Sequence, residues 1–205
     1  MQPSYLARHA KLKDAINFIG FVLLVFIGTL LINTFVFRSF SVLGHSMDST
    51  LGDGQRLIVN RLPITASQLA NKEYYPERGQ IIVFKNPQFV VDSSSKDQYI
   101  VKRVIAFPGE RVTVTDGVLK VYNVEHPTGY EPDLQWRKDG VGPKTPSSGE
   151  GLDMTVPDNT IFVSGDNRID NNSYDSRTGL GTIPTFDIVG PVSFRIYPFN
   201  TIQSF

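Results

Sequence analysis

The run AINFIGFVLLVFIGTLLINTFVF, residues 15–37, divides the chain into two parts of different physical character. It contains no charged residue and is dominated by Phe, Ile, Leu and Val. About 20 apolar residues in a helix span the hydrocarbon core of a bilayer, so this run is long enough to cross a membrane. It is longer than the apolar core of a secretory signal peptide, and no small-x-small cleavage site follows it closely. We therefore expect a retained transmembrane anchor in contact with the lipid bilayer.

Basic residues gather on the N-terminal side of this run. Arg8, Lys11 and Lys13 precede it and are opposed by Asp14 alone. By the positive-inside rule, residues 1–14 are expected in the cytoplasm and residues 38–205 outside it. The predicted location is the plasma membrane, crossed once.

Beyond Arg38, short β-branched and aromatic runs alternate with turn residues such as Gly52-Asp53-Gly54 and Asp116-Gly117. The expected strands are residues 55–60, 81–84, 98–105, 111–115, 118–122, 160–164 and 189–196. The pattern predicts a mainly β domain, a folded sheet or partly closed barrel, with one short helix within residues 63–77. Residues 123–157, with Trp136 as a large anchor, are rich in Gly, Pro, Ser and Asp and are expected to form an irregular insertion.

Charge and composition exclude several classes of function. The 20 basic residues balance the 20 acidic ones, so no positive field indicates nucleic acid as a partner. Cysteine is absent, which excludes disulfides, thiolate metal sites and a cysteine nucleophile. The three histidines, His9, His45 and His126, argue against a histidine-rich metal site. We expect neither a metal nor a cofactor.

The segment Gly44-His45-Ser46-Met47-Asp48-Ser49-Thr50-Leu51 follows the membrane run and contains a candidate nucleophile. Ser46 comes after an extended apolar segment and has apolar neighbours, although most loop serines are solvated turn residues. A serine nucleophile needs a base within hydrogen-bond reach. Because successive side chains of an extended chain point to opposite faces, His45 is a poor base for Ser46. His9 is expected on the wrong side of the membrane, and His126 abuts the irregular insertion.

Lys102 is the best remaining candidate for the base. It lies among Ile100, Val101, Val104 and Ile105, which favour an apolar environment, although period-two alternation equally permits an exposed lysine on an edge strand. A lysine acts as a base only when it is neutral, which requires its pKa to fall from about 10.4 to about 7–8. A fall of that size corresponds to about 4 kcal/mol of destabilisation of the ammonium form. Apolar burial can supply a shift of that size. We expect Lys102 to contact hydroxyls and apolar groups and no carboxylate directly.

A third polar segment follows the apolar run Ile161-Phe162-Val163. It reads Gly165-Asp166-Asn167-Arg168 and then Asn172-Ser173-Tyr174-Asp175-Ser176-Arg177. Its charged residues could form ion pairs that fix the loop, or the segment could be a solvated turn.

Taken in this order, the three segments resemble the motifs of bacterial signal peptidase I, the Ser-Lys enzyme that removes signal peptides from exported proteins. The nucleophile motif is similar to Ser46-Met47-x-x-Thr50-Leu51, the lysine motif to Lys102-Arg103-Val104-Ile105 with Pro108-Gly109, and the last motif to Gly165-Asp166-Asn167-Arg168 through Arg177. Arg78-Gly79-x-Ile81-Ile82-Val83-Phe84 resembles the strand before the lysine motif. The likeness covers residues 15–197 apart from 123–157, and the smaller single-anchor Gram-positive form is the most similar.

The resemblance implies a role for each motif. Ser46 would be the nucleophile, Lys102 the general base, and Ser173 the hydroxyl that orients the lysine amine, while the backbone N–H of Ser46 would stabilise the oxyanion. The partners would be preproteins with signal peptides, bound as an extended strand and cleaved after small residues at positions −1 and −3. The residues expected to line the pockets for those side chains are Phe40, Val42, Met47, Leu51 and Val101. The residues expected to hold the site together are Asp166, Arg168, Asp175 and Arg177.

The chain departs from the family pattern at several positions. Gly44 stands where some relatives carry an assisting serine, so only backbone donors remain there. Ser49 replaces a usual proline, Gln80 a usual aspartate and Ala106 a usual glycine. The loop before Ser173 is longer than the common form, which leaves Ser176 as the alternative residue for orienting the lysine.

Two other functions fit parts of the pattern. A catalytically silent relative of the same fold could act as an assembly factor for pilin or other surface proteins, but Ser46 and Lys102 are both retained. A self-cleaving repressor of related β fold would need a DNA-binding helix-turn-helix, and this chain has a membrane anchor in its place. The sequence favours a membrane-bound serine endopeptidase that removes signal peptides.

Overall fold

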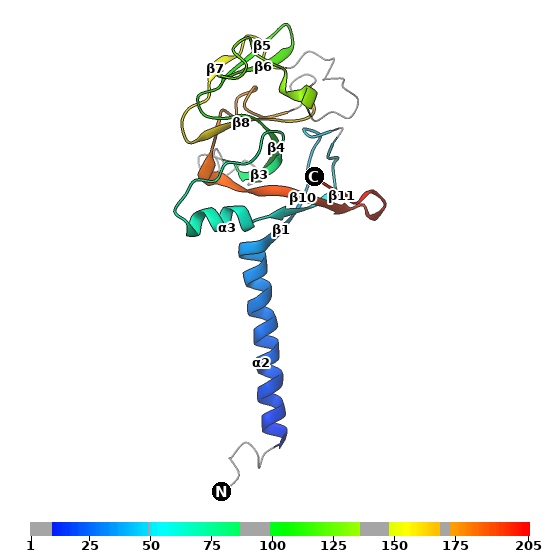
Figure 1. The fold of residues 1–205 in the computed structure, drawn as a ribbon. Helices are drawn as coiled ribbons and strands as arrows, with labels where there is room; N and C mark the ends of the chain where they lie inside the picture. The colour runs from blue at the N-terminus through cyan, green and yellow to red at the C-terminus, as the bar shows by residue number, and fades with distance from the viewer. Residues whose placement is uncertain (1–9, 49, 87–98, 136–147, 169–172) are drawn as a thin grey trace.

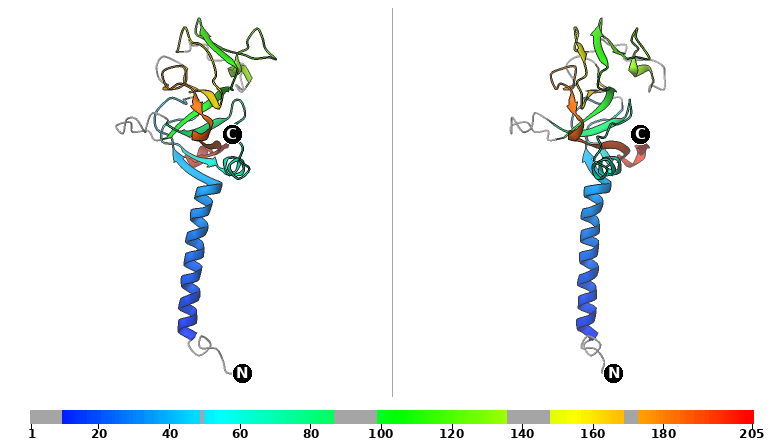
Figure 2. Two further views of the ribbon diagram at one scale, coloured as in Figure 1. Left: turned by 90° about the vertical axis from the view of Figure 1, so that its left-hand side faces the viewer. Right: turned by 60° about the vertical axis from the view of Figure 1, so that its left-hand side comes forward.

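The computed structural model describes residues 10–48, 50–86, 99–135, 148–168 and 173–205 and has a long helix with a β domain at one end (Figure 1, Figure 2). The predicted anchor corresponds to helix α2, Ala10–Leu31, continued by a short π-helix η1, Ile32–Val36. Within the described residues, Lys11–Val36 is the span long and apolar enough to cross a membrane, and none of it is buried in the protein. Strand β1 begins directly after it, at Phe37.

The domain is built around one antiparallel sheet of eight strands. In spatial order these are β1 (Phe37–Ser41), β2 (Arg56–Asn60), β10 (Ile188–Tyr197), β3 (Ile81–Lys85), β4 (Tyr99–Ala106), β8 (Thr160–Ser164) and β9 (Ile183–Pro184), with β11 (Gln203–Ser204) paired to β10. Register shifts interrupt β10 and β4. Such bulges bend a sheet and increase its twist. The sheet therefore curls into a half-barrel, which confirms the predicted mainly β fold.

Strand β3 explains how this sheet is covered on both faces. Ile81 and Val83 belong to one buried apolar cluster, and Ile82 and Phe84 belong to another. Because successive side chains of a strand point to opposite faces, a strand buried on both sides is a continuous apolar run. The sequence therefore identified this strand to within one residue of its end.

A second sheet of three strands lies at the end of the domain away from α2 (Figure 1). Strand β5 (Arg111–Thr115) pairs with β6 (Val118–Tyr122) and with β7 (Asp153–Thr155). Buried residues of this sheet pack against Phe162 of β8. Strand β7 lies within residues 123–157, where no strand was predicted, because three residues are too short to show an alternating pattern. Trp136 lies outside the described residues.

Helix α3, Leu62–Leu69, lies beside the domain end of α2 (Figure 1). It begins a little before the predicted range, with a proline in its first turn, a position that proline favours. The Thr65 hydroxyl donates to the Phe35 carbonyl at 2.9 Å, and the Arg61 N–H donates to the Val36 carbonyl at 2.7 Å. These bonds fasten α3 to η1 and fix the domain at the end of the long helix.

Candidate active site

A turn after β1 carries Ser46. Gly44 has a φ of 88°, in the left-handed region, where a serine backbone would be strained. The Gly44 N–H donates to the Asp53 carboxylate at 2.8 Å. The Leu51 N–H then donates to the Met47 carbonyl at 2.8 Å, closing a helical turn. Met47 and Leu51 are buried, so the two apolar neighbours pin the turn to the core and leave Ser46 half-buried at its surface.

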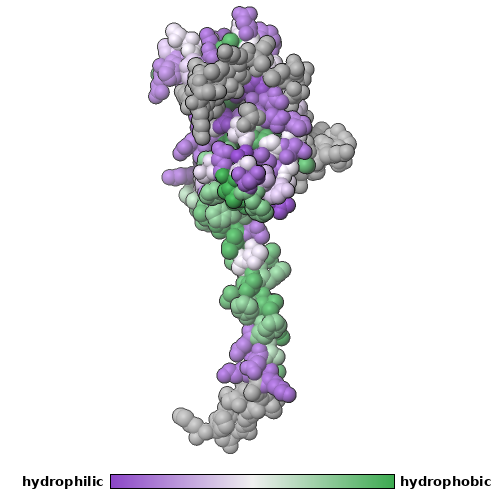
Figure 3. All heavy atoms as spheres, turned by 90° about the vertical axis from the view of Figure 1, so that its right-hand side faces the viewer, coloured by the Kyte–Doolittle hydropathy of each residue, from purple (hydrophilic) through white to green (hydrophobic). Residues whose placement is uncertain are grey.

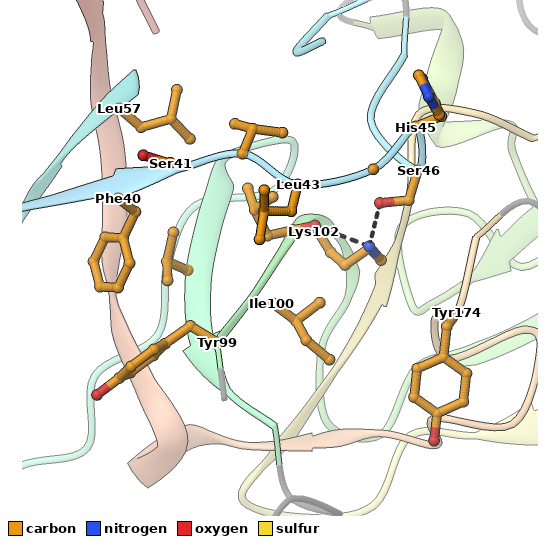
Figure 4. A pocket seen from close by; sticks show the side chains of 14 residues that line it. Phe40, Ser41, Leu43, His45, Ser46, Leu57, Tyr99, Ile100, Lys102 and Tyr174 are labelled. Carbon is orange, nitrogen blue, oxygen red and sulfur yellow. Dashed lines mark hydrogen bonds between the residues drawn. The ribbon is translucent and has the colours of Figure 1, made fainter. Parts of the chain in front are cut away.

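Lys102 projects from the middle of β4 towards this turn. Its side chain is buried, with 3% of the residue exposed. Its Nζ donates to Ser46 Oγ at 2.7 Å and to the Val101 carbonyl at 3.0 Å. Figure 4 shows the two side chains pointing at one another from separate segments of the chain. Both of these contacts are with uncharged oxygen atoms, the first being the hydroxyl contact expected from the sequence.

Two of the histidines are accounted for by other contacts. Figure 4 shows His45 turned away from Lys102, and its Nδ1 lies 3.0 Å from the Asp48 carboxylate. His126 packs on the ring of Tyr130 with centroids 4.5 Å apart. His9 lies outside the described residues. Neither described histidine is placed to take a proton from Ser46.

The loop after β8 closes over the back of the Ser46 turn. The Asn167 N–H donates to the Ser46 carbonyl at 3.0 Å, and the Asn167 side-chain amide donates to the His45 carbonyl at 3.0 Å. The approach is closest at Gly165, where a Cβ would lie 2.2 Å from Ser173 Oγ and 2.3 Å from the Ser46 carbonyl oxygen. Gly165 therefore allows a contact between loops that no larger residue would permit.

Ser173 and Ser176 occupy different environments. Ser173 Oγ lies against Gly165, beside the Ser46 turn, and donates to the Asp175 carboxylate at 2.6 Å. Ser176 Oγ accepts from the Val163 N–H of β8 at 3.0 Å and donates to the Gly181 carbonyl, just before β9, at 2.7 Å, so its hydroxyl links these two segments. Of the two serines proposed to orient the lysine, Ser173 is the one placed next to Ser46.

Asp166 connects the Ser46 turn to β4. The Arg103 guanidinium binds the two carboxylate oxygens of Asp166, at 2.7 Å from Nε and 2.5 Å from Nη2. The Thr50 hydroxyl donates to the same carboxylate at 2.6 Å. Burial opposes the charge on Asp166, but the hydrogen bonds and charge of Arg103 outweigh it and hold the pKa of Asp166 below its ordinary value. The partner of Asp166 is thus Arg103 rather than an arginine of its own loop.

Asp175 and Arg177 form a fully buried ion pair within the loop, with Arg177 Nη2 2.7 Å from Asp175 Oδ2. The Gly165 N–H donates to the same oxygen at 2.8 Å. Burial again disfavours the carboxylate, but the hydrogen bonds from Arg177, Ser173 and Gly165 dominate and lower the pKa of Asp175. The pair holds the position of the Ser173 hydroxyl and of Gly165 at once.

Arg168 reaches outside the loop. Its Nη2 donates to the Asp133 carboxylate at 2.5 Å, and both residues are buried. Asp133 lies within residues 123–157, so the predicted insertion contributes a buried residue behind the site. Neither Asp133 nor Asn167 was identified as a site residue from the sequence. Asn167 lies inside a motif that was recognised, whereas nothing near Asp133 marks it as the partner of a residue 35 positions away.

A cleft of about 280 Å³ opens beside Ser46 and Lys102. Its lining includes Phe40, Val42 and Val101, three of the five residues expected there. Met47 and Leu51 do not line it, because they anchor the Ser46 turn in the core. The walls combine apolar and polar groups, and the other lining residues are Ser41, Leu43, Gly44, His45, Leu57, Val83, Tyr99, Ile100 and Tyr174. Among the described residues no group of three or more Asp, Glu or His is placed to hold a metal ion.

Comparisons with known proteins agree on one family. A family model described as "Signal peptidase, peptidase S26" matches residues 13–197. The chain is 31% identical to signal peptidase I of Bacillus licheniformis over 193 residues, covering 94% of each chain. It is 34% identical to signal peptidase I T of Bacillus subtilis, covering 85% of this chain and 81% of that one.

Two further matches are of the same kind. Signal peptidase IB of Staphylococcus aureus is 30% identical, covering 93% of this chain and 94% of that one. A crystal structure of a signal peptidase I from Enterococcus faecalis is 28% identical with a TM-score of 0.39, covering 58% of this chain and 98% of that one.

Proposed function

Because this chain belongs to the S26 family of signal peptidases, which cleave signal peptides from preproteins, we propose that it does so with Ser46 as nucleophile and Lys102 as general base. The observation that carries the proposal is the 2.7 Å hydrogen bond between Ser46 Oγ and the buried amine of Lys102. A serine hydroxyl is a weak nucleophile until a neighbouring base removes its proton. The contact is at the distance that direct proton transfer requires.

The reaction follows from these two groups. The neutral Lys102 amine takes the proton of Ser46 as Oγ attacks the carbonyl carbon of the scissile peptide. The resulting ammonium gives that proton to the departing amine, which leaves an ester on Ser46. A water molecule, deprotonated by the same amine, then attacks the ester carbonyl and breaks its bond to Ser46 Oγ. The ammonium returns the proton to Oγ, which restores the Ser46 hydroxyl and the neutral amine and releases the cleaved signal peptide with a new carboxylate. The amine of Lys102 must be neutral at the start of each half-reaction, so the rate rises with pH as this amine loses its proton.

Backbone and loop groups support the two reacting residues. The backbone N–H of Ser46 is the proposed donor to the oxyanion, and Gly44 offers no hydroxyl to assist it. Ser173 is the proposed positioning residue for the lysine amine, through its place between Gly165 and Asp175. Asp166, Arg168, Asp175 and Arg177 are proposed to act indirectly, by fixing the loops that carry these groups.

The cleft suits an extended peptide with small side chains. Its volume is about 280 Å³ and apolar side chains line part of it, which favours small residues at the −1 and −3 positions of a signal peptide. Phe40, Val42 and Val101 are the proposed contacts, with the backbone before Ser46 and the end of β4 on either side of the peptide. No observation favours a silent assembly factor.

The long helix indicates a membrane-anchored protein, and we propose that the domain lies outside the plasma membrane with residues 1–14 in the cytoplasm. Since the chain has no cysteine, single cysteines can report this orientation. A Glu125→Cys variant in intact cells should react with a membrane-impermeant maleimide, whereas Ser4→Cys should react only after lysis. If Ser4→Cys reacted in intact cells and Glu125→Cys reacted only after lysis, the orientation would be the opposite one.

The decisive assay uses detergent-solubilised full chain and a preprotein whose signal peptide ends in Ala-x-Ala. Ser46→Ala should abolish cleavage, and Lys102→Ala should reduce kcat by at least about 10²-fold because general base catalysis is lost. Lys120→Ala, a lysine on the distant strand β6, is the matched control and should keep the wild-type rate. An inert wild-type protein, or full activity in Lys102→Ala, would disprove the mechanism.

A further inference from the structure

A polar groove lies where the long helix meets the domain. It has a volume of about 500 Å³ and is lined by Asn33, Thr34, Arg38, Ser39 and Arg61, which we call the junction groove. Asn33 and Thr34 belong to η1, Arg38 and Ser39 to β1, and Arg61 precedes α3. The groove is separate from the catalytic cleft, since the two have no lining residue in common.

The two arginines of the junction groove have no acidic partner within the described residues. Neither Arg38 nor Arg61 belongs to any of the ion pairs found there. Arg61 Nε is buried and has no hydrogen-bond partner among those residues. Burial and the neighbouring charge of Arg38 lower the pKa of Arg61. Two guanidinium groups that repel one another in a groove of neutral hydroxyls and amides are a site for an anion.

Arg38 is held in place by aromatic rings. Its guanidinium carbon lies 5.1 Å from the ring centroid of Phe40 and 4.8 Å from that of Tyr99. A guanidinium stacked on a ring can still donate hydrogen bonds from its edge, and it loses little side-chain freedom on binding an oxyanion. Arg38 is therefore oriented before any anion arrives.

The position of the junction groove indicates where the anion comes from. Arg38 follows the last residue of the membrane-spanning segment by two positions, which places it at the surface of the bilayer. On α3, Leu62 is 48% exposed and Leu69 is 85% exposed. Figure 3 shows apolar atoms along much of the long helix and again on the part of the domain nearest to it. Lipid headgroups thus surround the groove when the helix spans a membrane.

We propose that the junction groove binds the phosphate of an anionic phospholipid from the leaflet on the domain side. Arg38 and Arg61 donate to the phosphate oxygens, and Asn33, Thr34 and Ser39 offer neutral hydrogen-bonding groups around it. The inference rests on the membrane anchorage of the chain and does not depend on its catalytic mechanism.

Such a lipid would also affect the catalytic cleft. Phe40 and Tyr99, whose rings contact Arg38, also line that cleft, and their own centroids lie 5.1 Å apart. A phosphate that fixes Arg38 would therefore stabilise one wall of the substrate site. Anionic lipid is expected to lower KM for a preprotein more than it changes kcat.

The test measures bound lipid directly. The full chain is reconstituted in nanodiscs of equal parts phosphatidylglycerol and phosphatidylcholine, and the lipids retained after release are counted by native mass spectrometry. Wild type should retain phosphatidylglycerol preferentially. Arg38→Gln and Arg61→Gln should each reduce this preference by about fivefold, as expected for one arginine at a membrane surface. Arg56→Gln, an exposed arginine at the other end of β2, is the matched control and should behave as wild type.

Several outcomes would overturn the proposal. Equal retention of the two lipids by wild type would do so, as would an unchanged preference in the Arg38 and Arg61 double variant. If water-soluble glycerol phosphate competed with phosphatidylglycerol equally well, the groove would be a site for free phosphate. If the arginine variants changed KM for preproteins with acidic residues without any change in lipid retention, the groove would be a peptide site. Because lipid counting needs no catalysis, a Ser46→Ala background gives the same readout, so failure here is separate from failure of the peptidase assay.

Discussion

At residue 165 the absence of a side chain brings two loops together. An added methyl group would overlap both the Ser173 hydroxyl and the Ser46 carbonyl, and the second of these is backbone that cannot rotate away. The Ser46 turn would have to shift relative to Lys102. Misplacing a reacting group by about 1 Å can cost about 10²-fold in rate.

Gly165→Ala is therefore expected to lower kcat for preprotein cleavage by about 10²-fold while the domain remains folded. Gly52→Ala is the control, because its added methyl would meet only the Gln55 amide at 3.6 Å, an ordinary contact. Steady-state cleavage assays and circular dichroism of both variants make the comparison. Equal activity of the two variants would contradict the assigned role of Gly165.

The reacting residues could be proposed from the sequence because each lies within a short local motif. The groups that support them could be proposed only in part, because their pairings join distant segments. Arg103 lies in the lysine motif, but nothing local indicates that it binds Asp166, 63 positions later. Met47 and Leu51, expected in the substrate pocket, pack in the core instead of lining the cleft, since an apolar residue beside Ser46 can face either side.

At the scale of elements, the loop after β8 depends on one buried ion pair. The side chains of Asp175 and Arg177 are both fully buried, so removing the carboxylate takes this counter-charge away from a guanidinium in the core. Breaking such a pair costs about 3–5 kcal/mol. The Arg111–Asp153 pair on the second sheet has the same chemistry but is about half exposed, and solvent screens it.

Asp175→Asn should lower the free energy of unfolding by about 3–5 kcal/mol at pH 7, measured by urea denaturation in detergent. Asp153→Asn should change it little. The pKa of Asp175 is lowered in the folded protein from an ordinary value of 3.8, so its stabilising effect is complete above about pH 4 and is lost as pH falls further. The difference between wild type and Asp175→Asn should therefore narrow below pH 4. A difference that stays constant with pH would rule out this pair as its source.

Strands β2, β3, β4, β8 and β10 of the central sheet were predictable because they are long enough to show their β-branched runs, whereas β1 was not, since Phe37 continues the apolar run of the membrane segment. Strands β9 and β11 have two residues each and carry no such signal. The order of strands was not predictable from the sequence either. Strand β10 lies between β2 and β3, and this long-range pairing depends on packing of the whole domain rather than on any local pattern.

At the scale of the whole molecule, the helix and the domain meet without a linker. Helix α2, η1 and β1 follow one another with no intervening residue, and bonds from Arg61 and Thr65 fasten α3 across the junction. Ser46 comes ten residues after the end of the membrane span, at most about 33 Å of extended chain.

Because no linker separates the helix from the domain, the junction fixes the distance of Ser46 from the membrane. Ser46, the proposed nucleophile, lies at a fixed height above the bilayer. We therefore expect the cleaved peptide bond to be selected by how far the substrate's own helix extends from the membrane, as well as by the side chains in the cleft. Two residues inserted after Val36 should move the preferred bond away from the membrane end of the preprotein, a change that mass spectrometry of the new N-terminus would reveal. Cleavage at an unchanged bond would mean that side chains alone determine the position.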